Sequence, residues 1–549
     1  MRTLVAVVIA SLFALGAARA QEHGAHANEK GYAGLVDGLQ VAHHRIATSN
    51  PDAQRFFDQG LTLVYAFNHD EAVRAFRRAA ALDPKAAMPH WGIALALGPN
   101  INLDVDPVRE AAAYDAVQHA KTLAKRVPRI EQEYIDALTR RYSKAPDADL
   151  RKLAVDYSEA MAELSKRHPD DLDAATLYAE SLMDLRPWRL WTPDGKPADG
   201  TETIVRILES VLRCDPEHVG ANHYYIHAVE ASPHPERALP SAQRLETGVP
   251  AAGHLVHMPA HVYMRIGRYD EAARSNEAAI QTDRKYLSET GVEGVYPLMY
   301  YNHNVQFLGA ARAMEGRFSE AKRAAEELAA NASAGVREMP MLEFAVSEPL
   351  FVELRSARWA DVLARPAPDA SLSLTTALWR FGRGVAFAAT NRPKEAAAER
   401  DAFRKTRTQV PESAVFGGTG LNSARTILDL AGHVLDARIA LARNDRDAAV
   451  DSLEEAVKIQ DGLIYDEPPA WYYPVRESLG AALLRDGNAV DAERVFRADL
   501  ERNPNNGRSL FGLTRSLEAQ RRTADADFVR TFFDRAWKNA EIALRLEDL

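Results

Sequence analysis

The stretch from residue 53 to residue 84, AQRFFDQGLTLVYAFNHDEAVRAFRRAAALDP, indicates the fold class most clearly. Counted from its first residue, it carries small residues at positions 8, 20 and 27, an aromatic residue at 24 and a proline at 32: Gly60, Ala72, Ala79, Phe76 and Pro84. Small residues at this spacing let two antiparallel helices approach closely. The aromatic ring fills the space between successive helix pairs, and the proline ends the second helix. The stretch therefore predicts a helical hairpin.

The same spacing recurs along the chain. Further copies begin at Val219, Gly253, Asn302 and Tyr473, and weaker copies begin near Ala377 and Leu430. This pattern resembles the tetratricopeptide repeat (TPR), a helix–turn–helix unit of about 34 residues. The resemblance implies an all-α fold, an α-solenoid of TPR-like helix–turn–helix repeats that forms a right-handed superhelix with a concave groove. It also implies a secreted bacterial TPR protein when it is combined with the N-terminal segment described below.

The repeats and the breaks between them predict a division of the chain into segments. We expect a signal peptide at 1–20, a partly disordered segment at 21–50, TPR-like repeats at 51–125, divergent helical repeats with a loop (186–200) at 126–215, TPR-like repeats with a histidine cluster at 216–336, connecting helices and a linker at 337–375, and C-terminal TPR-like repeats at 376–549.

The N-terminal residues have the pattern of a secretory signal peptide. Arg2 precedes an apolar run from Leu4 to Ala17, and Ala18-Arg19-Ala20 follows as an A-x-A cleavage site. The run is short for a transmembrane helix, and no later stretch is apolar enough to suggest one. We expect an exported protein, periplasmic or secreted, without a transmembrane segment. An uncleaved N-terminal anchor is the alternative interpretation.

The composition excludes several classes of protein. The 549 residues include 67 Lys and Arg against 77 Asp and Glu, and the net charge of −10 argues against a nucleic-acid-binding protein. The single cysteine, Cys214, excludes an intrachain disulfide and cysteine-rich metal sites. The chain nevertheless contains 17 histidines, so a metal site would use nitrogen and oxygen ligands.

Two histidine pairs stand at the same position of successive repeats. His223 and His227 are four residues apart, and so are His257 and His261; the second pair follows the first by 34 residues, one repeat length. Residues four apart lie on one face of a helix. Two such pairs on neighbouring helices are a way for an all-helical protein to bring four imidazoles to a metal ion.

The resemblance to TPR proteins implies where these side chains lie. In such repeats, positions 2, 5, 9 and 12 line the concave groove, and here they include seven candidate site residues: His223, His227, Glu230, His254, His257, His261 and His303. We predict that the six histidines bind a transition metal, Zn, Cu or Fe, as one ion or two. Glu230 could be a ligand, an acceptor for an imidazole N–H, or a general base.

The sequence leaves other interpretations open. Such histidines can contact a protein or peptide ligand in the groove, or they can be buried hydrogen-bonding residues. Pro259 adds a difficulty for the helical argument: if the helix starts only near His257, His254 lies in the preceding loop. The metal hypothesis predicts redox or hydrolytic chemistry or metal handling and leaves open whether the chain is a metal-dependent enzyme. The alternative is a non-catalytic TPR scaffold that binds a protein or peptide.

Overall fold

The computed structural model describes residues 30–549 except 33 and 472–473. The expected signal peptide (1–20) therefore lies outside the described residues. The chain divides into two compact units, residues 1–262 with 278–301 and residues 263–277 with 302–549.

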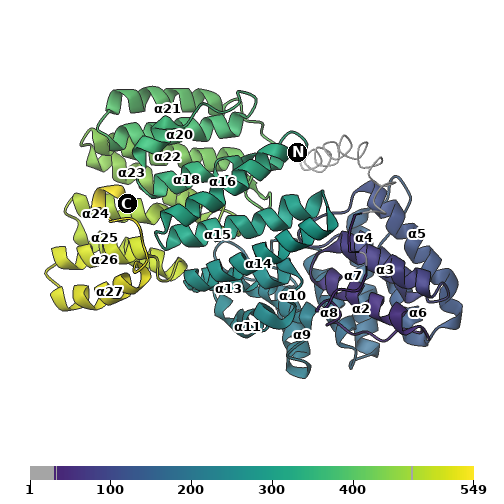
Figure 1. Cartoon of the computed structure of the whole chain (residues 1–549). Coiled ribbons are helices and arrows are strands. Elements are labelled where there is room, and N and C mark those ends of the chain that lie inside the picture. The colour runs from purple at the N-terminus through teal and green to yellow at the C-terminus, as the bar shows by residue number, and fades with distance from the viewer. Residues whose placement is uncertain (1–29, 33, 472–473) are drawn as a thin grey trace. The chain divides into compact units, whose positions relative to one another are not determined.

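The first unit consists of helices, and its longest connection joins α8 to α9 and contains the predicted loop at 186–200. Its elements are α2 (Pro51–Tyr65), α3 (His69–Leu82), α4 (Met88–Leu97), α5 (Pro107–Leu123), the 3₁₀ turn Ala124–Arg126, α6 (Arg129–Leu138), α7 (Leu150–Arg167), α8 (Leu172–Met183), α9 (Thr201–Cys214), α10 (Val219–Val229), the 3₁₀ turn Pro235–Ala238, α11 (Leu239–Gly248), α12 (Gly253–His257) and a π-helical turn, Tyr296–Tyr301. Consecutive helices pack as pairs, and α4 also packs on α2 (Figure 1). Two further helices, α13 (Pro259–Arg265) and α14 (Tyr269–Thr290), have residues in both units.

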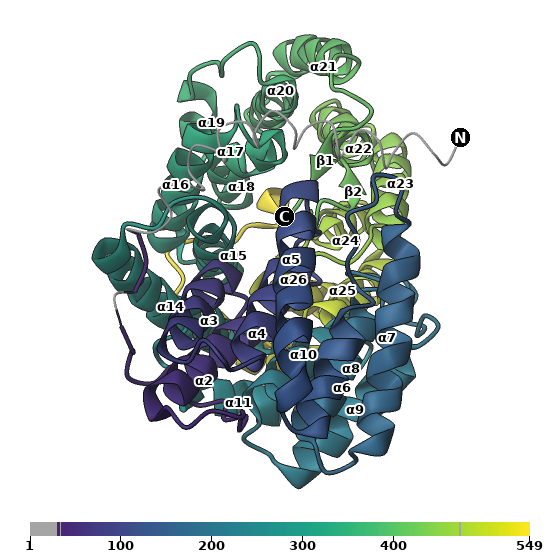
Figure 2. The same ribbon diagram turned by 90° about the vertical axis from the view of Figure 1, so that its right-hand side faces the viewer.

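The second unit has the same construction. Its elements are α15 (Asn302–Met314), α16 (Phe318–Gly335), the 3₁₀ turn Pro340–Leu342, α17 (Glu343–Val346), α18 (Glu348–Arg355), α19 (Trp359–Ala364), α20 (Ser373–Ala389), α21 (Pro393–Arg407), β1 (Val415–Phe416), β2 (Asn422–Ser423), α22 (Ala424–Ala442), α23 (Arg446–Asp461), α24 (Val475–Arg485), α25 (Ala489–Arg502), α26 (Gly507–Ala519), α27 (Thr523–Ala536) and the 3₁₀ turn Leu546–Asp548. The pairs α20–α21 and α22–α23 stack on one another (Figure 2). Strands β1 and β2 form a short antiparallel ladder. The prediction of an all-α solenoid is confirmed.

The glycine and phenylalanine of the repeat pattern pack directly against each other. A Cβ atom placed on Gly60 of α2 or on Gly92 of α4 would lie 2.6 Å from the ring of Phe76, which is fully buried on α3. The C-terminal repeats use the same contact, because a Cβ on Gly480 would lie 2.6 Å from the ring of Phe496. Real Cβ contacts are longer than this, so glycine is required where the helices are closest.

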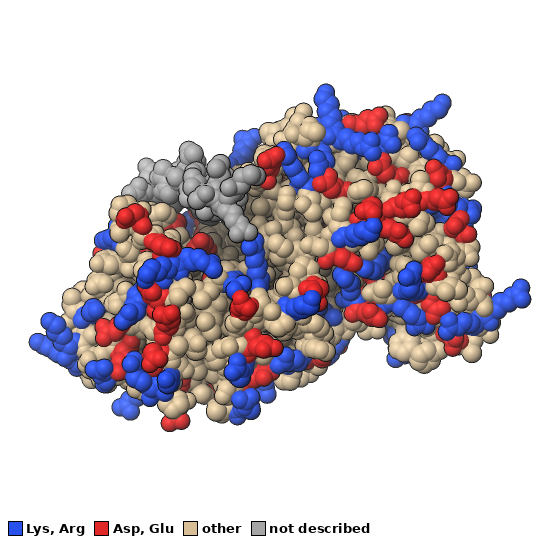
Figure 3. All heavy atoms as spheres, turned by 180° about the vertical axis from the view of Figure 1, so that it is seen from behind, with Lys and Arg blue, Asp and Glu red and all other residues tan. Residues whose placement is uncertain are grey.

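None of the helices among the described residues is long and apolar enough to cross a membrane. On the face that Figure 3 shows, basic and acidic side chains alternate, without a field of one sign.

Candidate metal centre

Three helices of the first unit bring five of the six predicted histidines together with Glu230. His223 and His227 lie on α10, and Glu230 is the residue that ends this helix. His254 and His257 lie on α12, which begins at Gly253 and ends at His257. His261 lies on α13, which begins at Pro259.

Pro259 interrupts the helical segment without removing a histidine from the site. It is the first residue of α13, where its missing N–H leaves no intrahelical hydrogen bond unmade. The helix before it starts at Gly253, so His254 is helical and lies within the site. The interruption separates His257 and His261 onto two short helices, yet their Nε2 atoms still lie 2.8 Å apart.

The Nε2 atoms of three imidazoles converge on one point. His223 Nε2 lies 3.1 Å from His227 Nε2 and 3.1 Å from His254 Nε2. Nitrogen atoms bound to one tetrahedral ion at about 2.0–2.1 Å would be separated by about 3.3 Å. These three residues form one of the groups whose geometry could hold a metal ion.

The opposite ring nitrogens show that two of these Nε2 atoms carry no proton. His223 Nδ1 donates to the backbone carbonyl of Tyr65 at 2.6 Å, and His227 Nδ1 donates to Glu230 Oε1 at 2.8 Å. Carbonyl and carboxylate oxygens only accept hydrogen bonds, so in the neutral rings both protons sit on Nδ1. The lone pairs of His223 Nε2 and His227 Nε2 therefore face each other, an arrangement that a cation between them would stabilise.

Burial keeps these rings neutral while Glu230 stays ionised. Burial and the neighbouring His227 hold the pKa of His223 well below its usual value. Burial also lowers the pKa of His227, against the opposing effect of Glu230. Burial alone would raise the pKa of Glu230, but His261 and His227 lower it to about 2. The Glu230 carboxylate thus places a negative charge in the interior, and a metal cation would offset it.

Glu230 joins the two histidine pairs. Its Oε2 atom accepts from His261 Nδ1 at 2.5 Å, while its Oε1 atom accepts from His227 Nδ1. Among the roles that the sequence leaves open for Glu230, this geometry is that of an acceptor for imidazole N–H groups, which fixes the tautomer and orientation of the two rings.

The structure corrects the expected setting of the histidines. The resemblance to TPR proteins implies that they line the concave groove, but all five are buried, with exposed fractions between 0 and 5%. Aromatic rings enclose them: Phe67 lies 4.5 Å from His223 between ring centroids, Trp188 lies 5.4 Å from His227, and Tyr300 lies 5.0 Å from His254. A peptide in an exposed groove would not reach these imidazoles in this conformation.

Three residues that the sequence did not single out complete the centre. Tyr65 and Phe67 lie in the first repeat, 158 and 156 residues before His223, and reach it because α10 packs on α2. Trp188 belongs to the predicted loop at 186–200. Phe67 and Trp188 both have positive φ, at 55° and 58°, which is uncommon for aromatic residues. No periodicity or spacing in the sequence indicates these contacts.

A partly buried carboxylate holds Tyr65 in place. Asp173 Oδ1 accepts from the Tyr65 hydroxyl at 2.5 Å, and Asp173 Oδ2 accepts from His44 Nδ1 at 2.8 Å. His218 Nε2 lies 3.3 Å from the same carboxylate, and its Nδ1 accepts from the Ala221 backbone N–H at the start of α10. Asp173 thereby fixes both the first turn of α10 and the residue whose carbonyl orients His223.

The sixth predicted histidine belongs to the second unit. His303 is the second residue of α15 and belongs to the second unit, where its ring packs against Phe307 at 4.9 Å. Its role as a metal ligand stays a prediction.

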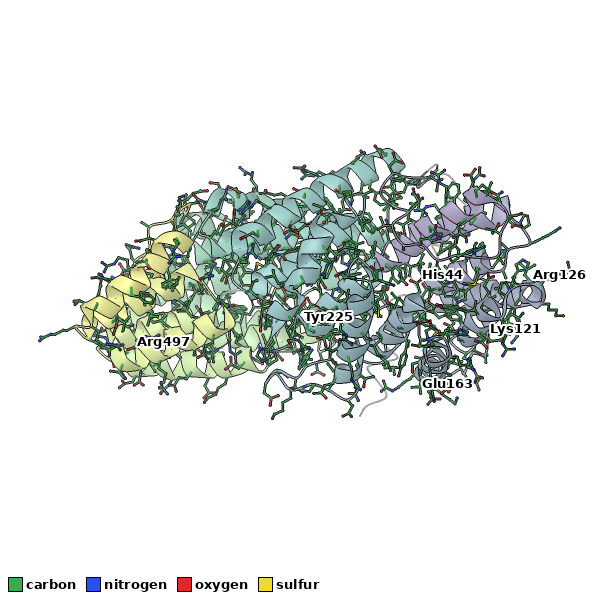
Figure 4. All side chains as sticks on the ribbon, turned by 90° about the horizontal axis from the view of Figure 1, so that it is seen from below. His44, Lys121, Arg126, Glu163, Tyr225 and Arg497 are labelled. Carbon is green, nitrogen blue, oxygen red and sulfur yellow. The ribbon has the colours of Figure 1, made fainter. Side chains whose placement is uncertain are left out.

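Figure 4 labels two residues of the first unit that lie outside the histidine group, His44 and Tyr225. The Tyr225 hydroxyl donates to Glu209.

A buried carboxyl group in the second unit was also not predicted. Asp466 has an exposed fraction of 3%, and its Oδ1 atom accepts from the backbone N–H groups of Thr419 and Glu467. Its Oδ2 atom has no hydrogen-bond partner among the described residues. Burial raises the pKa of Asp466 to about 7.

Comparisons with known proteins return structural likeness only. No known family model and no curated protein matches the sequence. Among solved structures, a human IFIT1 dimer with m7Gppp-AAAA is 11% identical and covers 92% of this chain and 96% of its own, with a TM-score of 0.35. Yeast Tom70 is 10% identical, covers 87% and 90%, and has a TM-score of 0.27. The APC/C hetero-tetramer Cut9–Hcn1 is 14% identical, covers 85% and 78%, and has a TM-score of 0.29.

These superpositions are loose, so the repeat type rests on the helical hairpins of the chain itself. The glycine–phenylalanine contacts at Gly60 and Gly480 occur at the positions where the repeat pattern requires them. The repeats are of the TPR type. The histidine centre lies inside the first of the two units.

Proposed function

We propose that this TPR-type protein binds a transition metal ion through His223, His227 and His254. The observation that carries the proposal is the pair of proton-free Nε2 atoms, on His223 and His227, that face each other at 3.1 Å in a fully buried centre. Imidazole ligands suit Zn, Cu and Fe. Glu230 fixes His227 and the Tyr65 carbonyl fixes His223, as outer residues commonly do around metal-binding histidines.

The bound ion would serve redox or hydrolytic chemistry or metal handling. Three histidine ligands leave a fourth coordination position open, as catalytic zinc sites do. The aromatic shell of Phe67, Trp188 and Tyr300 limits the access of water to this position. Tyr65 and Glu230 orient the ligands, and the neighbouring histidines keep the Glu230 carboxylate ionised. The ion would supply Lewis acidity or electron transfer.

Metal analysis of the purified mature protein tests this proposal. We expect at least one equivalent of transition metal after reconstitution, and its loss in a His227→Ala/His261→Ala double variant. His234→Ala is the matched control, because this histidine lies in the same unit with a largely exposed side chain that contacts Glu236. Less than about one-tenth of an equivalent in the wild-type protein, with no gain on reconstitution, would refute the proposal.

We also propose that the protein is exported. The support is the sequence pattern of residues 1–20, in which Arg2 and an apolar run precede Ala18-Arg19-Ala20. N-terminal sequencing of the protein recovered from a periplasmic extract should start at Gln21. Recovery of the full-length chain from the cytoplasm alone would contradict export.

The alternative function is a protein-binding scaffold, which the TPR-type fold favours. Pull-down from a periplasmic extract should then return a partner. A partner retained by the His227→Ala/His261→Ala variant would separate protein binding from the histidine centre, since these side chains are buried.

A further inference from the structure

The second histidine pair repeats the geometry of the first. His257 Nε2 and His261 Nε2 lie 2.8 Å apart, and both residues have an exposed fraction of 0%. The pair occupies the same repeat position as His223 and His227, 34 residues further along the chain. Each pair thus presents two Nε2 atoms to one point in the interior of the first unit.

Glu230 makes the two points distinct. It accepts from His227 Nδ1 through Oε1 and from His261 Nδ1 through Oε2, so the neutral forms of both rings carry their proton on Nδ1. The proton-free Nε2 of His227 faces His223, whereas that of His261 faces His257. One ion beside His223 would therefore leave the lone pair of His261 facing His257.

We propose that the centre holds two metal ions, the second bound by His257 and His261; this inference rests on the proposed metal-binding function. The rings of His227 and His261 lie 5.4 Å apart, and those of His254 and His257 lie 5.7 Å apart, so the two ions are near neighbours. Glu230 orients one ligand of each ion. Two histidines leave the second ion with open coordination positions for an exogenous ligand.

The ligands of the second site are again imidazole nitrogens, which suit Zn, Cu and Fe. The second ion therefore belongs to the same class of transition metal as the first.

Metal stoichiometry tests the second ion separately from the first. The mature protein is stripped with a chelator, loaded with Cu(I) or Zn²⁺, desalted and analysed for metal. We expect two equivalents in the wild type and in the His234→Ala control, and one equivalent in His257→Ala. The second ion would be overturned if the wild type bound one equivalent, and if His257→Ala kept this equivalent while His223→Ala lost it. That result would leave the first ion in place. An absence of metal would refute the metal-binding function itself.

A spectroscopic measurement on the intact wild-type protein guards against variants that fail to fold. Two neighbouring Cu²⁺ ions interact magnetically, so the electron paramagnetic resonance spectrum should show either a half-field transition or an integrated signal below the copper content. The spectrum of isolated Cu²⁺ alone, with an integral equal to the copper content, would overturn the two-ion arrangement. His257→Gln keeps the side-chain volume close to that of histidine and should give the spectrum of isolated Cu²⁺.

Discussion

The replacement of Glu230 by glutamine tests the centre most directly. The wild-type carboxylate accepts from two imidazoles, His227 Nδ1 and His261 Nδ1. A glutamine side chain offers one carbonyl oxygen and one NH₂ group, so it accepts from one imidazole only. The other ring must then carry its proton on Nε2, where the metal would bind. Glu230→Gln therefore removes one imidazole ligand from the metal without removing a histidine.

The magnitude follows from the effect of such outer residues on metal affinity. Loss of a partner that orients a ligand typically weakens metal binding about 10–100-fold. At a free metal concentration of 100 Kd for the wild type, the metal stabilises the folded protein by about 2.7 kcal/mol. The same concentration should stabilise Glu230→Gln by only about 1.4 kcal/mol for a 10-fold loss and about 0.4 kcal/mol for a 100-fold loss.

The assay is urea unfolding of both proteins, with and without metal, followed by circular dichroism. We expect the metal-dependent part of the unfolding free energy to fall in Glu230→Gln by at least about 1.3 kcal/mol. If Glu230 only held a buried hydrogen-bond network, its replacement would change the metal-free protein alone. Equal metal-dependent stabilisation in the two proteins would refute the reasoning.

Three further predictions concern stability. Tyr65→Phe removes the hydrogen bond to the partly buried Asp173 and should lower the unfolding free energy by about 1.5–3 kcal/mol. An unchanged urea midpoint would contradict this. Asp466, with a folded pKa of about 7, keeps its proton where the unfolded chain has lost it, so stability should fall as pH rises from about 4 to 7. Asp466→Asn should abolish that part of the pH dependence in urea titrations, and persistence of the slope would be the contrary result. Gly480→Ala places a Cβ 2.6 Å from an aromatic ring and should lower the unfolding free energy by about 1–3 kcal/mol in thermal unfolding. The control Gly309→Ala places its Cβ 3.5 Å from the nearest atom and should leave the unfolding free energy almost unchanged. Equal effects of the two substitutions would contradict the packing argument.

The sequence by itself determined the repeat class and most of the candidate ligands. Repeats are readable because each hairpin contacts its neighbours through residues at fixed spacing, as Gly60 and Phe76 do. The pairs His223/His227 and His257/His261 were found for the same reason: helical periodicity and repeat length together place side chains without knowledge of distant contacts.

Only the tertiary structure decided how the histidines are held. The proton positions of His223 depend on the carbonyl of Tyr65, 158 residues away, which α10 meets because it packs on α2. The rings of Phe67 and Trp188 cover histidines that the repeat resemblance places on the concave groove. Such contacts join residues that are far apart in the chain, so no local pattern encodes them. Phe67 and Trp188 also have positive φ, which their residue types do not indicate.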